Sequence, residues 1–225
     1  SGQVREMATK KLQDADPELH DEFLGELNRV AGEKGFFRVY VTAAYEPINN
    51  TLARGLENVL QESDLRNKKR ILTRLKKLQK QKIIESHDLL AIFTEIQNIT
   101  QTPLVIVIDE FGKNLDFMSH HHGKGDIFII QQLAEMPSFY LWVCLHQAFD
   151  EYAIGLSTVQ RQEWSKVQGR FENITFMEST AQMLYLMQKA LEQDFPRDVR
   201  IKINNFAEKA HQFILKGDLA DKDKL

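Results

Sequence analysis

Residues 103–113 constrain the fold of this chain more than any other stretch. The stretch begins at Pro103, continues as the apolar run 104–108, and turns abruptly polar at Asp109 and Glu110. A short apolar run between a proline and a glycine is typical of a strand that is buried on both faces. Such strands occur in parallel sheets covered by helices, so we expect an α/β protein.

The two carboxylates stand where the predicted strand leaves the sheet. In an open α/β sheet, ligands bind at the carboxyl ends of the strands. A metal ion there can neutralise charge that develops on a phosphate, and a neighbouring carboxylate can aim a water nucleophile. Asp109 and Glu110 are therefore candidate site residues. The alternative is a core strand that ends in a solvated acidic turn.

Further apolar runs are predicted to be strands of the same sheet. Residues 36–43 are aromatic and β-branched, and a helix-like pattern follows them. Residues 139–145 form another apolar run, which ends at His146 and Gln147, and a last short strand is expected at 173–177. The predicted fold is α/β, with a mostly parallel sheet that has helices on both faces.

The remaining segments are predicted to be largely helical. Residues 3–34 carry a helix-like apolar stripe that breaks near Pro17, where Asp16 is expected to cap a second helix. We expect residues 1–178 to form one α/β core and residues 179–225 to form a C-terminal helical segment. A glutamate in the loop after the first strand, Glu46, is expected to be solvated.

The most biased segment, residues 64–84, is predicted to be a basic helical excursion from the core. Nine basic residues and no acidic residue lie between Arg66 and Lys82, while Ile71 and Leu75 help to form an apolar face. Such a helix can bind the phosphate backbone of a nucleic acid or another anionic surface. The alternative is a solvated helix whose apolar stripe packs on the domain.

Together, these motifs resemble the ATPase core of large bacterial AAA-like P-loop proteins, in the AAA+ and STAND class, some of which occur in phage-defence loci. The resemblance covers roughly residues 36–180. It rests on the stretches FFRVYVTAAYEP (36–47), VIDEFGKNL (107–115), GDIFIIQQLAE (125–135), LHQAFDEYA (145–153) and QRQEWSKVQGRFENI (160–174).

The resemblance implies a site for ATP and Mg²⁺ and, with it, a P-loop NTPase fold. Asp109 matches the residue of the Walker B element that helps to hold Mg²⁺, usually through water. Glu110 matches the residue that orients or deprotonates the attacking water. The implied activity is ATP hydrolysis within a larger protein that couples it to conformational change.

Residues after the next strand have implied roles in the same site. His146 or Gln147 stands at the place of the residue that senses the γ-phosphate. Arg161 or Arg170 would contact phosphate, because the guanidinium fork matches phosphate oxygens. That contact can come from a neighbouring subunit, so self-association into an oligomer is a further implication.

The phosphate-binding loop of such enzymes, Gly-x-x-x-x-Gly-Lys followed by Ser or Thr, is missing from the sequence. The Gly-Lys pairs at 112–113 and 123–124 lack both the leading Gly and the Ser or Thr, and they follow the Walker B-like strand. We therefore expect the chain to be a fragment whose loop lies before residue 1, and to be inactive by itself.

Composition narrows the possible compartments and partners. The net charge of −3 predicts no overall attraction to nucleic acid, and no apolar stretch has the length of a membrane span. The single cysteine, Cys144, lies in an apolar run and is expected to be a buried structural thiol. Three adjacent histidines, His120, His121 and His122, favour a surface loop over a metal site. A cytoplasmic location is expected.

Two other functions are alternatives to ATP hydrolysis. One is a non-catalytic module that uses the sheet as a scaffold and binds nucleic acid or a protein through residues 66–82. The other is a metal-dependent nuclease built on Asp109 and Glu110. The sequence lacks the additional carboxylates and the lysine that a nuclease site of this kind needs.

Overall fold

The structure, a computed structural model, describes residues 2–32, 34–121, 127–175, 179–190 and 196–216. The chain divides into two compact units, Ser1–Glu172 and Asn173–Leu225. The first unit contains the sheet and all the sequence-predicted site residues. The second contains helices α10 (Thr180–Ala190) and α11 (Arg197–Lys216).

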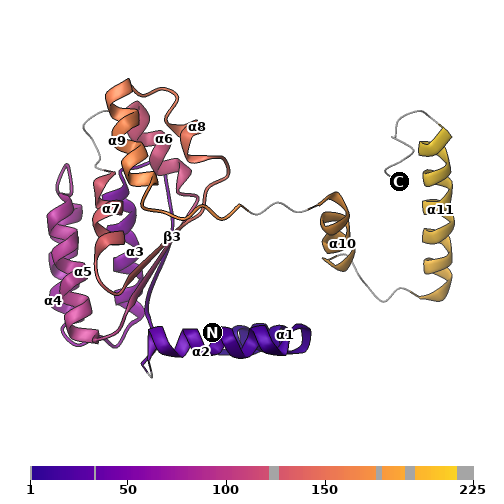
Figure 1. Cartoon of the computed structure of the whole chain (residues 1–225), viewed down its shortest axis with the longest axis horizontal. Helices are drawn as coiled ribbons and strands as arrows, with labels where there is room; N and C mark the ends of the chain where they lie inside the picture. Colours follow the sequence, from indigo (N-terminus) through magenta and orange to yellow (C-terminus); the bar gives the residue numbers. More distant parts are fainter. Residues whose placement is uncertain (1, 33, 122–126, 176–178, 191–195, 217–225) are drawn as a thin grey trace. The chain divides into compact units, whose positions relative to one another are not determined.

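The first unit alternates helices with three parallel strands (Figure 1). The strands are β1 (Phe37–Thr42), β2 (Leu104–Asp109) and β3 (Phe139–Val143). The helices are α1 (Gly2–Ala15), α2 (Pro17–Ala31), α3 (Ile48–Glu62), α4 (Lys68–Gln79), α5 (Ser86–Thr100), α6 (Gly112–His120), α7 (Phe128–Glu135), α8 (Phe149–Tyr152) and α9 (Thr158–Gln168).

The apolar run at 104–108 forms the central strand, because β2 pairs in parallel with β1 on one side and with β3 on the other. The register places Thr42 opposite Asp109 and Ile108 opposite Val143. The prediction of an α/β protein with a parallel sheet is therefore confirmed. Within the described residues the sheet has three strands, and the P-loop NTPase fold stays a prediction.

Helices α3, α5 and α7 cover one face of the sheet (Figure 1). Side chains alternate along each strand, and those on this face, such as Val39, Ile106 and Ile108, are fully buried. Helix α3 approaches β1 closely at Gly55, where an added Cβ would lie 2.9 Å from Cβ of Val41. A larger side chain at position 55 would force these two elements apart.

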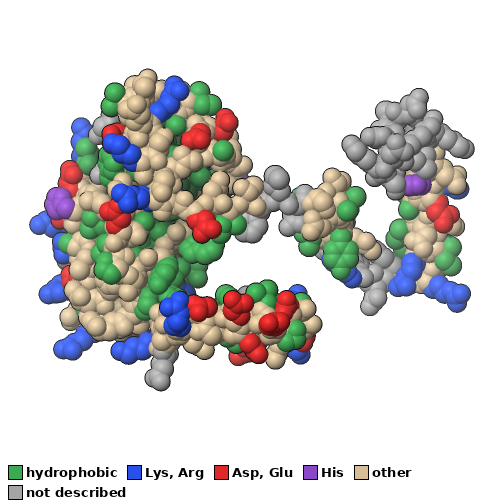
Figure 2. Space-filling model, viewed as in Figure 1, with side chains coloured by type: hydrophobic (Ala, Val, Ile, Leu, Met, Phe, Trp, Pro, Cys, Tyr) green, Lys and Arg blue, Asp and Glu red, His purple; other side chains and the backbone are tan. Residues whose placement is uncertain are grey.

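The opposite face of the sheet is largely exposed, which corrects the expectation of helices on both faces. Tyr40, Tyr140 and Trp142 on this face are 62%, 40% and 55% exposed, and Val105 and Val107 of β2 are half-buried. Figure 2 shows hydrophobic side chains at the surface in this region. The strands follow one another in order, and right-handed crossovers then place the covering helices α3, α5 and α7 on the same face.

Two helices form as their sequence patterns predict. Asp16 caps α2, since its side chain accepts a hydrogen bond from the Leu19 amide at 3.0 Å, and Pro17 opens the helix. Helix α4 buries Ile71, Leu75 and Leu78 and leaves its basic residues outward. The basic amphipathic helix is thus confirmed as a structural element.

Several local predictions are wrong or fall outside the described residues. Residues 173–175 are not a strand, and 176–177 of the predicted strand 173–177 lie outside the described residues. Helix α6 was not predicted, because the histidines after it suggested a loop. Helix α7 begins at Phe128.

Candidate functional site

The carboxyl edge of the sheet brings three separate segments together. Asp109 ends β2, and its carbonyl accepts a hydrogen bond from the Ala43 amide at 2.8 Å. On the other side, the Cys144 amide donates to the Ile108 carbonyl at 2.9 Å, and the Phe111 amide donates to the Cys144 carbonyl at 3.0 Å. These bonds hold the segment after β1, the turn after β2 and the segment after β3 side by side.

Glu110 has an unusual backbone conformation in this turn. Its φ angle is 53°, in the left-handed region that glutamate rarely adopts. The Glu110 amide donates to Oδ1 of Asp109 at 2.9 Å, which helps to hold the turn. A non-glycine residue in this region costs about 1–2 kcal/mol, and such residues cluster at functional sites.

The carboxylate of Glu110 is paired with a basic side chain of α6. It forms an ion pair with Lys113 in the first turn of α6, three residues further along the chain. The hydrogen bond and the charge of Lys113 lower the pKa of Glu110 below its ordinary value, and the nearby imidazole of His146 lowers it further. Glu110 is therefore ionised at neutral pH, as a group that accepts a proton must be.

The structure thus brings Asp109, Glu110 and His146 to one edge. Asp109 is exposed, and it borders a shallow hollow of about 300 Å³ on the open face, which Tyr40 and Val107 also line. His146 and its neighbour Gln147 are both exposed in the segment after β3. These residues come from the ends of adjacent strands, as the sequence predicts.

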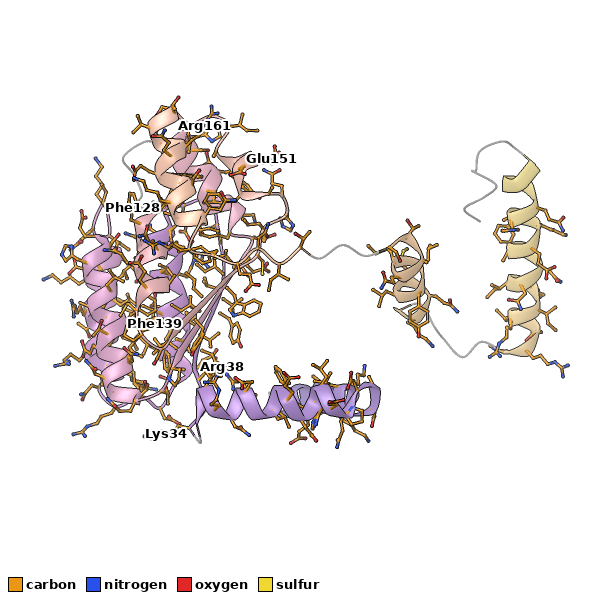
Figure 3. The ribbon with its side chains drawn as sticks, viewed as in Figure 1. Lys34, Arg38, Phe128, Phe139, Glu151 and Arg161 are labelled. Atoms are coloured by element: carbon orange, nitrogen blue, oxygen red, sulfur yellow. The ribbon has the colours of Figure 1, made fainter. Side chains whose placement is uncertain are left out.

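The two candidate arginines instead contact other parts of the protein. Arg161 on α9 donates from Nε to the Leu156 carbonyl at 3.1 Å and from Nη2 to the Ile154 carbonyl at 3.0 Å. It lies beyond the carboxyl ends of the strands, whereas Arg38 and Phe139 lie toward their beginnings (Figure 3). Arg170 pairs with Glu135 of α7 at 3.3 Å. A phosphate contact by either arginine remains a prediction.

A buried polar network beside the site was missed by sequence reasoning. Asn114 of α6 is fully buried, and its Nδ2 donates to the Glu46 carbonyl at 2.8 Å and to Oγ1 of Thr51 at 2.9 Å. Thr51 in turn donates to the Glu46 carboxylate at 2.8 Å, as does Arg54 at 2.7 Å. The expectation that Glu46 is solvated is wrong, since its side chain is only 25% exposed.

This network ties the loop after β1 to the helix after β2. A signal for it was present in the sequence: Phe111, Leu115 and Met118 recur at helical spacing, and Asn114 falls on the same stripe. A polar residue on a buried stripe needs hydrogen-bond partners, and here they come from a distant segment. The Oδ1 atom of Asn114 is buried without a partner among the described residues.

Helix α4 places half of its charge in ion pairs. Arg70 and Arg74 pair with Glu95 of α5, and Lys76 lies 3.7 Å from Glu57 of α3. These contacts attach the helix to the core. They reduce the charge available to an external anion.

Two further expectations concern residues with reactive side chains. Cys144 is exposed, which corrects the expectation of a buried thiol, because it follows Trp142 on the open face of the sheet. His121 stacks on Phe117 with ring centroids 4.2 Å apart. The described residues contain no cluster of three potential metal ligands from His, Cys, Asp or Glu, and His122 is outside them.

Comparison with known proteins adds no family to this description. No protein-family model matches the chain, and no curated protein matches it. Among the helices of the described residues, none combines the length and apolar character needed to cross a membrane.

Proposed function

We propose that this chain is the ATP-binding and ATP-hydrolysing core of a larger P-loop ATPase. The observation that carries the proposal is the position of Asp109 and Glu110 at the carboxyl end of the central parallel strand, beside His146 from the next strand. Ligands of open α/β sheets bind at this edge. The left-handed backbone of Glu110 is a second support, because strained residues cluster at functional sites.

Each residue has a distinct role in the proposal. Glu110, ionised and partly exposed, orients or deprotonates the attacking water. His146 or Gln147 contacts the γ-phosphate or that water. The outer edge of β3 pairs with no strand among the described residues, so a further strand that carries the phosphate-binding loop has a place to pair in this proposal.

The residues present fit a magnesium ion. Mg²⁺ in nucleotide sites is usually held by one or two carboxylates together with waters and phosphates, and Asp109 offers an exposed carboxylate at this edge. One of its oxygens accepts a hydrogen bond from the Glu110 amide, and the other accepts none from the described residues. When bound, the ion would neutralise charge that develops on the transferred phosphate.

The test is ATP turnover by the full natural protein and by Glu110→Gln. We expect turnover to fall by about 10²–10⁴-fold, because general-base catalysis contributes that much, while ATP binding is retained. Glu151→Gln is the matched control, since Glu151 is an exposed acid on α8. Turnover by Glu110→Gln at the wild-type rate would contradict the proposal.

A second candidate function is binding of an anionic partner through α4, with the sheet as scaffold. Lys69 and Lys77 favour it, because they form no ion pair within the described chain and lie opposite the buried stripe of this helix. In Lys69→Glu/Lys77→Glu, nucleic-acid binding should show a smaller dependence on salt than in wild type. An unchanged salt dependence would exclude nucleic acid as the partner of this helix.

A further inference from the structure

Tyr152 of α8 packs directly against the turn that carries the two acids. Its side chain is buried, with the residue 7% exposed. A Cβ added at Gly112 would lie 2.1 Å from the Tyr152 hydroxyl oxygen and 2.5 Å from Cζ of the ring. The ring therefore occupies the space that any side chain at Gly112 would need, and α6 can begin here only because residue 112 is glycine.

The hydroxyl of Tyr152 also meets the segment after β3. Burial raises the pKa of Tyr152, as does the nearby charge of Asp116, while hydrogen bonding with the backbone of His146 and Gln147 acts in the opposite direction. The hydroxyl thus lies at the backbone of both candidate γ-phosphate sensors. It stays protonated at neutral pH, so it can donate as well as accept a hydrogen bond.

Helix α8 is itself fixed by packing. Phe149, three residues before Tyr152, contacts Trp164 of α9 with ring centroids 5.7 Å apart. Trp164 is buried in the core. One end of the short helix is thereby anchored to α9, and the other presents the Tyr152 ring to the carboxyl edge of the sheet.

We propose that Tyr152 is a positioning residue that holds His146 and Gln147 at a set distance from the Asp109-Glu110 turn. The ring contacts Gly112 at the start of α6, and the hydroxyl meets the backbone of His146 and Gln147. The effect on ATP turnover rests on the proposed function. The positional role does not depend on it and is tested separately.

The first experiment measures amide hydrogen exchange in the chain. Tyr152→Phe keeps the ring and removes only the hydroxyl, so the melting temperature should change little. We expect the amides of His146 and Gln147 to exchange about tenfold faster or more. Tyr140→Phe is the control, because Tyr140 is exposed near the start of β3. Unchanged exchange at both amides would overturn the role of the hydroxyl.

A double-mutant cycle tests the contact between the ring and the turn. Gly112→Ala should lower the melting temperature in the wild-type background, because the new Cβ collides with Tyr152. In a Tyr152→Ala background the same change should be neutral or stabilising, since the space is then free. Equal effects in both backgrounds would overturn the packing role of the ring. Gly25→Ala is the control for the replacement of glycine itself, because a Cβ added at Gly25 would meet no atom within 4 Å.

The last experiment measures turnover in the full natural protein. Tyr152→Phe should lower kcat about tenfold and leave the KM for ATP nearly unchanged, because binding does not require the sensor to be in place. An unchanged kcat in an active protein would overturn the catalytic consequence. If the wild-type protein hydrolyses no ATP, the proposed function fails, and the exchange experiment still decides whether Tyr152 positions the segment.

Discussion

At the carboxyl edge of the sheet, charged and polar side chains come from separate segments, whereas the charges of α4 all lie on one helix. Asp109 and Glu110 meet His146 because the adjacent parallel strands β2 and β3 end at the same edge of the sheet. On α4, the cations are spaced along one surface, and several are held by acids of α3 and α5. The sequence of α4 has the higher density of charge, yet only at the sheet edge do side chains from the ends of different strands meet. A reaction requires several side chains at one point, and here the order and direction of the strands bring them together.

The largest stability effect is expected at the sheet edge, from loss of the buried amide of Asn114. Asn114→Ala leaves the Glu46 carbonyl and the Thr51 hydroxyl short of a partner. We expect a loss of about 2 kcal/mol in the free energy of unfolding, measured with denaturant. Asn58→Ala on the exposed side of α3 is the control and should not destabilise. Equal losses of stability at both positions would show that the buried network around Asn114 does not cause the effect.

A smaller effect should separate the left-handed residues of the two regions. Glu110 has φ 53°, and Asn67 at the start of α4 has φ 67°. Asparagine tolerates this conformation better than glutamate does, so Glu110→Gly should stabilise the fold by about 1 kcal/mol and Asn67→Gly by much less. Thermal unfolding of both variants measures the difference. If both gain equally, the strain assigned to Glu110 is not specific to the site.

Removal of Lys113 should change the titration of Glu110. The pKa of Glu110 is lowered mainly by Lys113, so Lys113→Met should raise the pKa back toward its ordinary value. The ion pair stabilises the fold at neutral pH, and this contribution is lost as the pH falls through the lowered pKa. Carboxyl NMR titration measures the change, and Lys113→Arg, which keeps the charge, is the control. An unmoved pKa in Lys113→Met would show that the ion pair does not set it.

The smallest effect is expected from the exposed lysines of α4. Lys69→Gln/Lys77→Gln should change the free energy of unfolding by less than about 0.5 kcal/mol, because neither side chain has an ion-pair partner in the described structure. Denaturant unfolding is the measurement. A large loss of stability would mean that the exposed lysines of α4 help to hold the fold. The two regions would then not differ in how much their charged side chains contribute to stability.

The strands and the acidic turn were predictable because their signals are local. The apolar run before Asp109 identified the central strand, and polar residues after two runs identified the edge at which they meet. No local signal in the sequence shows whether helices cover one face of the sheet or both. Val105 and Val107 are as apolar as Ile106, yet only Ile106 is fully buried. Strand order and crossover direction decide this, and neither leaves a periodic pattern in the sequence.

The partners of buried polar groups were not predictable either. Asn114 and Glu46 are 68 residues apart, and nothing near either residue indicates the other. The contact of Tyr152 with Gly112 likewise has no local signal, because it forms only when helices α6 and α8 pack together. A pattern can show that a polar residue will be buried. It cannot show which distant atom will satisfy it.

By itself, the sequence determined the alternation of strands and helices, the central strand and the acids that follow it, because hydrophobic periodicity acts over a few residues. Tertiary structure alone decided that one face of the sheet stays open, that Glu46 joins a buried network, and that Tyr152 packs on the acidic turn. These features depend on chain crossings and long-range contacts, whose energies arise only when distant segments are packed together.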